Sequence, residues 1–111
     1  MKYSIEKITT LIGARRIGNT DATIGWILTD SRSLCFPEET LFFAIRTQRN
    51  DGHNYIPELY RRGVRNFVVE TLPDTNAYAD ANFLKVVGTL EALQRLAERH
   101  RDEFDIPGVG I

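Results

Sequence analysis

The chain has 111 residues, which is enough for one ordinary domain, and a formal net charge of −1 at pH 7. Acidic and basic residues nearly balance, which argues against a general nucleic-acid-binding protein, since such proteins carry a marked basic excess. No apolar run is long enough to cross a membrane, and charged residues such as Glu6 and Arg15 lead us to expect no secretory signal in residues 1–30.

The first half of the chain predicts one helix and three strands. Isoleucine and leucine at helical spacing predict a helix over residues 4–12, with Ser4 as its N-cap and Gly13 after its end. Residues 14–17 are expected to form a short strand. After a turn-rich break, residues 23–28 predict a strand rich in β-branched and aromatic residues. Residues 41–45, a continuous apolar run, are typical of a strand that is covered on both faces.

The second half alternates between helices and strands. A helix is expected over residues 54–62, with Pro57 in its first turn and Gly63 after its end. Strands follow at 66–69 and 83–87, separated by an irregular excursion over 72–82, and the clearest helix spans 90–100. This alternation indicates parallel βαβ units. The predicted fold class is therefore α/β, a three-layer α/β/α domain with a small, mostly parallel sheet.

The single cysteine, Cys35, has no partner for an internal disulfide, and no cysteine and histidine residues have zinc-binding spacing. This composition is typical of a reducing compartment, so we expect a cytoplasmic protein. Cys35 lies between apolar neighbours, which predicts a buried residue that reacts slowly with thiol reagents.

Two polar clusters directly follow predicted strands. Thr29, Asp30, Ser31 and Arg32 follow the strand over 23–28, and residues 46–53 follow the strand over 41–45. Because ligands gather at the carboxyl ends of parallel strands, the two clusters are candidates for one shared site. The guanidinium of Arg32 is suited to a phosphate or carboxylate. The competing interpretation of the first cluster is an ordinary Asx-type turn with an exposed arginine.

The second cluster contains Asn50, Asp51, Gly52 and His53, with Arg46 and Arg49 just upstream. Asp-Gly is first a turn signal, and Asn50 or Asp51 is also suited to begin the next helix. The alternative is an anion site at the helix N-terminus. Nothing else in the sequence supplies a nucleophile with its base or a pair of catalytic carboxylates. The residues alone thus predict an α/β binding module with one polar site, and they do not identify its ligand.

The end of the chain indicates a domain boundary. Residues 107–111 have the pattern of a linker that enters a strand, and no complete phosphate-binding loop is present. We therefore expect residues 1–106 to form one domain, and residues 107–111 to begin the connection to a further, ATP-binding domain. On this interpretation the 111 residues neither bind nor hydrolyse ATP.

Three blocks resemble the N-terminal domain of Mur ligases of the MurE and MurF types. They are Asp30-Ser31-Arg32, then Leu41-Phe42-Phe43-Ala44-Ile45, then Asp51-Gly52-His53 before a helix. The order and spacing agree over about residues 20–111. The sequence departs from the family at Glu38-Glu39, where a Gly-Asp pair is usual, and at Thr47, where a glycine is usual. The remaining pattern is most similar to MurF ligases (UDP-N-acetylmuramoyl-tripeptide–D-alanyl-D-alanine ligases) that are fused to an alanine racemase.

The resemblance implies a ligand and a set of contacts. The N-terminal domain of these ligases binds the uridine diphosphate part of UDP-N-acetylmuramoyl-peptide (UDP-MurNAc-peptide). Matching positions would contact or shape that pocket, namely Thr29, Asp30, Ser31, Arg32, Ala44, Arg49, Asp51, Gly52 and His53. No metal or cofactor is expected in these residues. ATP, Mg²⁺ and D-alanyl-D-alanine would be bound by downstream central and C-terminal domains of a longer chain, which would form an amide bond in peptidoglycan synthesis.

Two alternatives remain open beside a MurF-type substrate-binding domain. One is the N-terminal domain of a MurE-type ligase. The other is a non-catalytic regulatory or interaction module on a similar α/β fold. The presence of both the Asp30-Ser31-Arg32 and the Asp51-Gly52-His53 blocks favours a ligase, since a regulatory module has no need of both.

Overall fold

A five-stranded sheet forms the centre of the computed structural model, which describes residues 3–30, 32, 34 and 36–100, with side chains as far as 98. The strands are β2 (Arg15–Ile17), β4 (Trp26–Leu28), β5 (Thr40–Phe43), β6 (Asn66–Val69) and β7 (Asn82–Lys85), in the order β2-β7-β6-β5-β4. Neighbouring strands are parallel except at the β2 edge, where β2 runs antiparallel to β7. The predicted small, mostly parallel sheet is confirmed.

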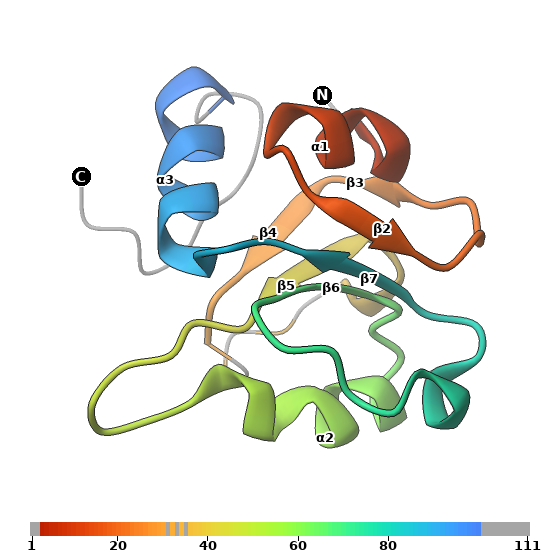
Figure 1. Ribbon diagram of the computed structural model, residues 1–111. Helices are drawn as coiled ribbons and strands as arrows, with labels where there is room; N and C mark the ends of the chain where they lie inside the picture. Colours follow the sequence, from red (N-terminus) through yellow and green to blue (C-terminus); the bar gives the residue numbers. More distant parts are fainter. Residues whose placement is uncertain (1–2, 31, 33, 35, 101–111) are drawn as a thin grey trace.

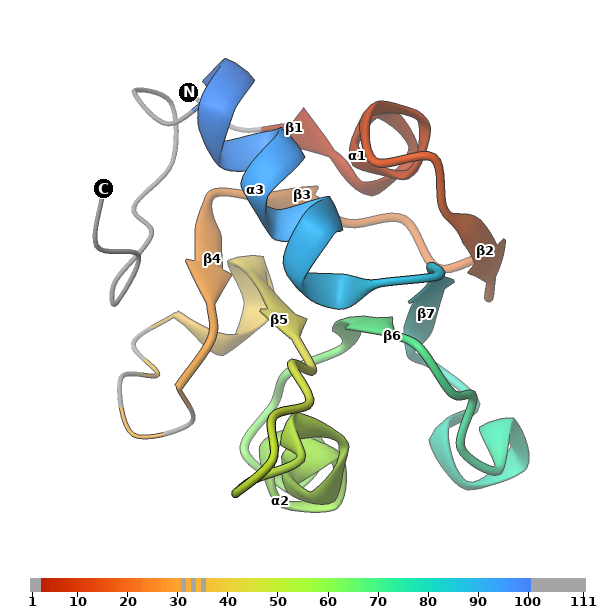
Figure 2. The same cartoon turned by 60° about the vertical axis from the view of Figure 1, so that its left-hand side comes forward.

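Helices cover both faces of this sheet. Helices α1 (Ile5–Leu11) and α3 (Thr89–His100) lie on one face, and α2 (Ile56–Arg61) with the 3₁₀ helix η4 (Thr75–Tyr78) lies on the other. Figure 2 shows the sheet between these two layers, and Figure 1 shows α2 below it with α1 and α3 above. The three-layer α/β/α prediction is therefore confirmed.

Strands β5 and β6 are buried along their whole length. Successive side chains of a strand point to opposite faces. Leu41 and Phe43 accordingly pack with α1 and α3, whereas Phe42 packs with α2 and with Phe67 of β6. Because both faces need apolar side chains, the run over residues 41–45 shows no polar alternation.

The predicted strand over 23–28 is two strands that belong to two sheets. Strand β3 (Thr23–Ile24) pairs antiparallel with β1 (Tyr3–Ser4), whereas β4 pairs with β5. Between them the N–H of Gly25 donates to the carbonyl of Glu39, the residue directly before β5. The apolar pattern continues through Gly25, so it did not reveal the change of partner.

The helix predicted over 54–62 begins later in the structure, because α2 starts at Ile56. A 3₁₀ helix, η3 (Gly52–Tyr55), precedes α2, and the Asp51 side chain caps it by accepting a hydrogen bond from the backbone N–H of His53. Pro57 has no N–H to donate to the carbonyl four residues earlier, which favours the tighter 3₁₀ turn before it. The predicted end is confirmed, since α2 ends before Gly63, whose φ is +107°.

Other boundaries also differ, among them those of the strands expected over 14–17 and 41–45, which cover Arg15–Ile17 and Thr40–Phe43. The excursion over 72–82 contains η4, the last strand covers 82–85, and a short 3₁₀ helix, η2 (Pro37–Glu39), precedes β5. Ser4 caps α1 as predicted, because its hydroxyl accepts a hydrogen bond from Lys7. Among the described residues, no helix combines the length and the apolar character that a membrane crossing requires.

Candidate functional site

The two predicted polar clusters meet at the edge of the sheet where parallel strands β4, β5 and β6 end. A cavity of about 450 Å³ is lined there by Thr29, Asp30 and Arg32 from the segment after β4, and by Asn50 and Tyr55 from the segment after β5. Each wall therefore comes from a different strand end. This is the position at which open α/β sheets bind ligands.

In the first wall, Asp30 and Arg32 bind each other within one turn of chain. The Asp30 carboxylate accepts hydrogen bonds from Nε and Nη2 of Arg32 at 2.9–3.2 Å, and from the Arg32 backbone N–H at 3.0 Å. The side-chain hydrogen bonds from Arg32 lower the pKa of Asp30, and the same bonds raise the pKa of Arg32. The Arg32 side chain is 88% exposed, so this pair lies in solvent at the rim of the cavity.

The pairing leaves part of the Arg32 guanidinium available. A guanidinium offers five N–H donors, and Asp30 binds the edge formed by Nε and Nη2. The edge formed by Nη1 and the second hydrogen of Nη2 can still bind an anion through two parallel hydrogen bonds. Asp30 therefore orients Arg32 without occupying all of its donors.

The second wall begins with a tight loop between Arg46 and Asp51, which form an isolated antiparallel bridge. Inside the loop, the backbone N–H of Thr47 donates to the carbonyl of Asn50, and the Asn50 N–H donates to the Thr47 hydroxyl. The Asn50 side-chain oxygen accepts a hydrogen bond from the hydroxyl of Tyr55 at 3.2 Å. These contacts fix an amide and a phenol beside the cavity.

His53 fastens this loop to the next strand. Its Nδ1 lies 2.6 Å from Asp51 Oδ1, and its Nε2 accepts hydrogen bonds from the backbone N–H groups of Glu70 at 3.0 Å and Thr71 at 3.4 Å. Since a backbone N–H can only donate, Nε2 carries no proton, and Nδ1 is the nitrogen that donates to Asp51. The geometry thus selects one neutral tautomer of His53, with the ring joining the end of β6 to the loop after β5.

Asp51 lies at the centre of these contacts. Burial raises the pKa of its carboxyl, but hydrogen bonds from the His53 backbone and ring and from Arg46 outweigh that effect and lower the pKa below its usual value. Arg46 Nε donates to Asp51 Oδ2 at 3.1 Å, and its Nη1 lies 4.0 Å from Glu70 Oε1. Glu70 in turn accepts hydrogen bonds from the backbone N–H and hydroxyl of Thr89 at the start of α3.

The loop can lie close to the sheet because Gly52 has no side chain where it approaches Ala44. The Gly52 N–H donates to the carbonyl of Ile45 at 2.8 Å. A Cβ added to Gly52 would lie 2.7 Å from the backbone nitrogen of Ile45 and 2.9 Å from the Cα of Ala44, which is too short for any side chain. Ala44 itself is fully buried, so its small side chain affects the site through packing.

The sequence-predicted residues thus fall into three groups. Thr29, Asp30 and Arg32 line the cavity. The other residues do not line it and instead hold the loop of the opposite wall in place, namely Ala44, Asp51, Gly52 and His53. Arg49 is exposed at the turn of the loop between Arg46 and Asp51. Ser31 and Cys35, with the predictions made for them, lie outside the described residues, as does the connection over 107–111.

Sequence reasoning missed two contributors. Tyr55 lines the cavity, but its position inside a predicted helix gave no signal that its hydroxyl would reach Asn50. Glu70 connects the loop to α3, and its position directly after an apolar strand was the available signal. Among the described residues, no group of three or more acidic, histidine or cysteine side chains is arranged to hold a metal ion.

Comparison with known families matches residues 23–101 to the model described as "Mur ligase family, catalytic domain". A UDP-N-acetylmuramoyl-tripeptide–D-alanyl-D-alanine ligase from Synechocystis is 36% identical over 91 residues, covering 82% of this chain and 19% of that protein. A UDP-N-acetylmuramoyl-L-alanyl-D-glutamate–2,6-diaminopimelate ligase from Cytophaga hutchinsonii is 32% identical over 85 residues, covering 77% of this chain and 17% of that protein.

Solved structures show the same relationship. A crystal structure of MurF from Acinetobacter baumannii superposes with a TM-score of 0.74 and 25% identity, covering 92% of this chain and 22% of that one. A structure described as a UDP-N-acetylmuramoylalanyl-D-glutamyl-2,6-diaminopimelate–D-alanyl-D-alanyl ligase from the same organism gives a TM-score of 0.75. The chain therefore spans about a fifth of the length of the relatives that it matches.

Proposed function

The chain belongs to the Mur ligase family, with the fold of a MurF-type N-terminal domain, and on this premise we propose that it binds the uridine diphosphate part of a UDP-MurNAc-peptide. The observation that carries the proposal is the cavity at the carboxyl ends of β4 and β5, lined from both predicted segments. In this proposal the 111 residues recognise substrate, and the bond-forming chemistry belongs to other domains of a longer chain.

The groups around the cavity match the two parts of that ligand. A pyrimidine base presents carbonyl acceptors and an N–H donor, and the hydroxyl of Thr29 and the amide of Asn50 can bind groups of both kinds. The Tyr55 ring offers an aromatic surface for a base. A diphosphate requires a cation, and Arg32 at the rim has an open guanidinium edge for it.

The second wall gives the site its shape. His53, Asp51 and Arg46 hold the loop against β6, and Gly52 lets it approach Ala44 without a clash. We assign these residues to positioning, because their polar atoms already bind one another. Arg49, exposed at the turn, is a second candidate for contact with the phosphates or with the sugar that follows them.

For the longer protein we propose a cytoplasmic, ATP- and Mg²⁺-dependent ligase of peptidoglycan synthesis that adds D-alanyl-D-alanine to UDP-MurNAc-tripeptide. The D-alanyl-D-alanine ligase from Synechocystis and the MurF structures support this MurF-type assignment. A MurE-type ligase is the second candidate, favoured by the 32% identity to the 2,6-diaminopimelate ligase from Cytophaga hutchinsonii. Assaying the longer protein with D-alanyl-D-alanine and with 2,6-diaminopimelate distinguishes the two.

Calorimetric titration of UDP and of UDP-N-acetylmuramic acid into the 111-residue chain tests the binding proposal. Since a charge-assisted hydrogen bond is strong, Arg32→Ala should weaken binding about ten-fold, without a change in the thermal unfolding midpoint. Arg61→Ala, which removes an exposed arginine from α2, is the matched control and should leave affinity unchanged. Equal affinity of the two variants would contradict the role of Arg32.

A further inference from the structure

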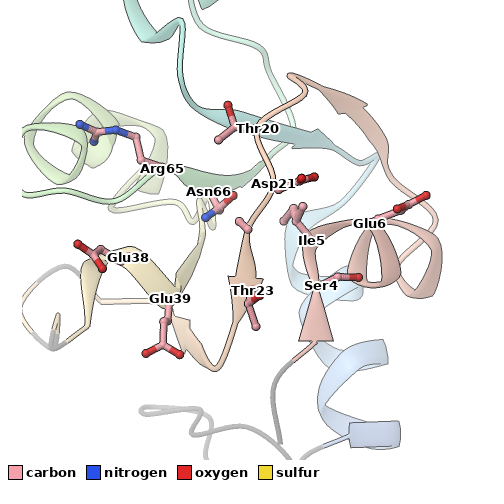
Figure 3. Close-up of a pocket in the computed structure, with 11 residues that line it drawn as sticks. Ser4, Ile5, Glu6, Thr20, Asp21, Thr23, Glu38, Glu39, Arg65 and Asn66 are labelled. Carbon is pink, nitrogen blue, oxygen red and sulfur yellow. The ribbon is translucent and has the colours of Figure 1, made fainter.

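The loops at the two edges of the sheet are fastened by side chains of different chemistry. At the edge where β6 begins, a cavity of about 730 Å³ is lined in part by the loop after β2, as Figure 3 shows. The Thr20 carbonyl of that loop accepts hydrogen bonds from Asn82 Nδ2 and Arg16 Nη2. Amide and guanidinium groups keep one charge state at ordinary pH. At the other edge, the loop over 46–55 is fastened by the imidazole of His53, a group that titrates near neutral pH.

His53 can fasten its loop only while the ring is neutral. Its Nε2 accepts hydrogen bonds from the backbone N–H groups of Glu70 at 3.0 Å and Thr71 at 3.4 Å. A protonated ring carries a hydrogen on both nitrogens, so Nε2 would then face two donors with a donor of its own. Both bonds to the end of β6 must therefore break when the ring takes up a proton. The hydrogen bond between Nδ1 and Asp51 is compatible with either form.

Charged groups of both signs surround the ring. Asp51 lies on the loop itself and Glu70 at the end of β6, whereas Arg46 donates to Asp51 and lies 4.0 Å from Glu70. On the α3 side, Glu91 and Arg95 line a cavity together with Glu70 and carry opposite charges. Although burial raises the pKa of the Asp51 carboxyl, its hydrogen bonds outweigh this effect and lower the pKa. An ionised carboxylate thus stays beside the ring at neutral pH and stabilises an imidazolium.

The loop that His53 fastens is also one wall of the uridine cavity. Asn50 and Tyr55 line the cavity from this loop. Arg46 reaches the end of β6 as well, but its contacts there are exposed and long, at 3.5 Å from the Thr71 hydroxyl and 4.0 Å from Glu70. Exposed contacts of this kind are weak. Loss of the two bonds to Nε2 therefore loosens the wall that carries the amide and the phenol.

We propose that His53 makes the uridine site pH-sensitive, because the neutral ring holds the loop over 46–55 against β6 and protonation of Nε2 releases it. The inference rests on the proposed uridine site and adds its regulation. The neutral ring is the form that binds, so affinity is full above the pH at which the ring titrates and falls below that pH. If the neutral form alone binds, one pH unit below the midpoint of the ring titration costs about ten-fold in affinity.

The test is calorimetric titration of UDP-N-acetylmuramic acid into the 111-residue chain at several values between about pH 5 and 8. The diphosphate of this ligand is esterified at both ends and its carboxylate ionises at lower pH, so the ligand keeps one charge over the range. NMR signals of the His53 ring report its charge at each pH. Affinity should fall as the ring becomes protonated, and bound ligand should keep the ring neutral at pH values at which the free chain is protonated.

Two glutamine variants separate His53 from other titrating groups. In His53→Gln the side-chain oxygen can still accept a hydrogen bond from the end of β6, but it takes up no proton in this range. This variant should bind with nearly the affinity of the unchanged chain at the upper end of the range and should lose the pH dependence. His100→Gln, which changes the other histidine of the chain, should keep the full pH dependence.

Hydrogen exchange of the unliganded chain gives a second measurement. After correction for the intrinsic exchange rates, the protection of the Glu70 and Thr71 amides should fall as the ring is protonated. The Asn82 side-chain amide, which binds Thr20 at the other edge, should not change.

The outcomes distinguish this switch from the uridine site itself. Binding that does not change as the ring titrates, an equal pH dependence in His53→Gln, constant protection of Glu70 and Thr71, or a ring that stays neutral throughout the range would each refute the switch alone. Absence of binding at every pH would refute the uridine site and the switch with it.

Discussion

The two walls of the uridine cavity are built in different ways. In the wall after β4, the side chains of Asp30 and Arg32 bind each other across two positions of the chain, and this ion pair lies in solvent. The loop over 46–55 forms the other wall. His53 joins this loop to the end of β6 by a hydrogen bond, and Arg46 lies next to Glu70, which binds the start of α3. The Asp30–Arg32 pair is therefore a local contact, whereas the loop over 46–55 depends on contacts between distant parts of the chain.

This difference predicts where substitutions will affect stability and where they will affect binding alone. Changes in the 46–55 wall break contacts that join strands and helices, so they should lower the free energy of unfolding. Changes at Asp30 or Arg32 break an exposed ion pair that contributes little to stability. Ligand affinity should respond to both walls.

Gly52→Ala should have the largest effect. The new Cβ meets backbone atoms of Ala44 and Ile45 at 2.7–3.0 Å, and the loop must move away from the sheet to relieve the clash. We expect the free energy of unfolding to fall by about 3 kcal/mol, at the upper end of the usual range for overpacking. Urea unfolding followed by fluorescence or circular dichroism measures it.

Gly88→Ala is the matched control for Gly52→Ala. A Cβ at Gly88 would meet the carboxylate of Glu91, which is the end of a flexible side chain that can turn away. Its effect on stability should be much smaller. If the two alanine variants are equally stable, the loop over 46–55 is not held against the sheet as described.

His53→Ala should have the next largest effect. It leaves the backbone N–H groups of Glu70 and Thr71 without their acceptor and removes the ring from Asp51. Loss of a buried acceptor costs about 2 kcal/mol. Asp30→Asn, which weakens the exposed wall, should leave the unfolding midpoint nearly unchanged, and a loss as large as that of His53→Ala would refute the contrast between the walls.

The smallest expected effect is a dependence of stability on pH. Because hydrogen bonds from His53 and Arg46 lower the Asp51 pKa below 3.8 despite burial, folding favours the ionised carboxylate. That contribution is fully present above about pH 4, close to the unfolded pKa, and is lost as the pH falls through the lower folded pKa. Acid unfolding should show a shallower loss of stability below pH 4 for Asp51→Asn than for the unchanged chain, and identical profiles would exclude this role of Asp51.

The same contrast between local and distant contacts explains how much of the fold the sequence predicted. Ser4 capping α1 and Gly63 ending α2 are local patterns that were predicted correctly, and the buried strand expected over 41–45 is present as Thr40–Phe43. The break at Gly25 was not predicted, because what divides β3 from β4 is a change of partner strand. A hydrophobic pattern shows which residues are buried but not which strand they pair with.

The candidate site divides in the same way. The sequence indicated that the segments after the β4 and β5 strands would share one edge of the sheet, because parallel strands place their carboxyl ends together. It did not show that His53 would accept hydrogen bonds from Glu70 and Thr71, which are 17 and 18 residues away. Nor did it show the cavity at the opposite edge of the sheet, whose lining spans residues 4–66.

The most direct test of the proposed uridine site is the map of amide chemical shifts when UDP is added to the ¹⁵N-labelled 111-residue chain. We predict that the perturbed amides cluster in residues 29–32 and 46–55, at both walls of the cavity. Residues 20–23 and 65–66, at the opposite edge of the sheet, should not move and serve as an internal control. Saturable shifts confined to that opposite edge, or shifts that avoid both walls, would contradict the account.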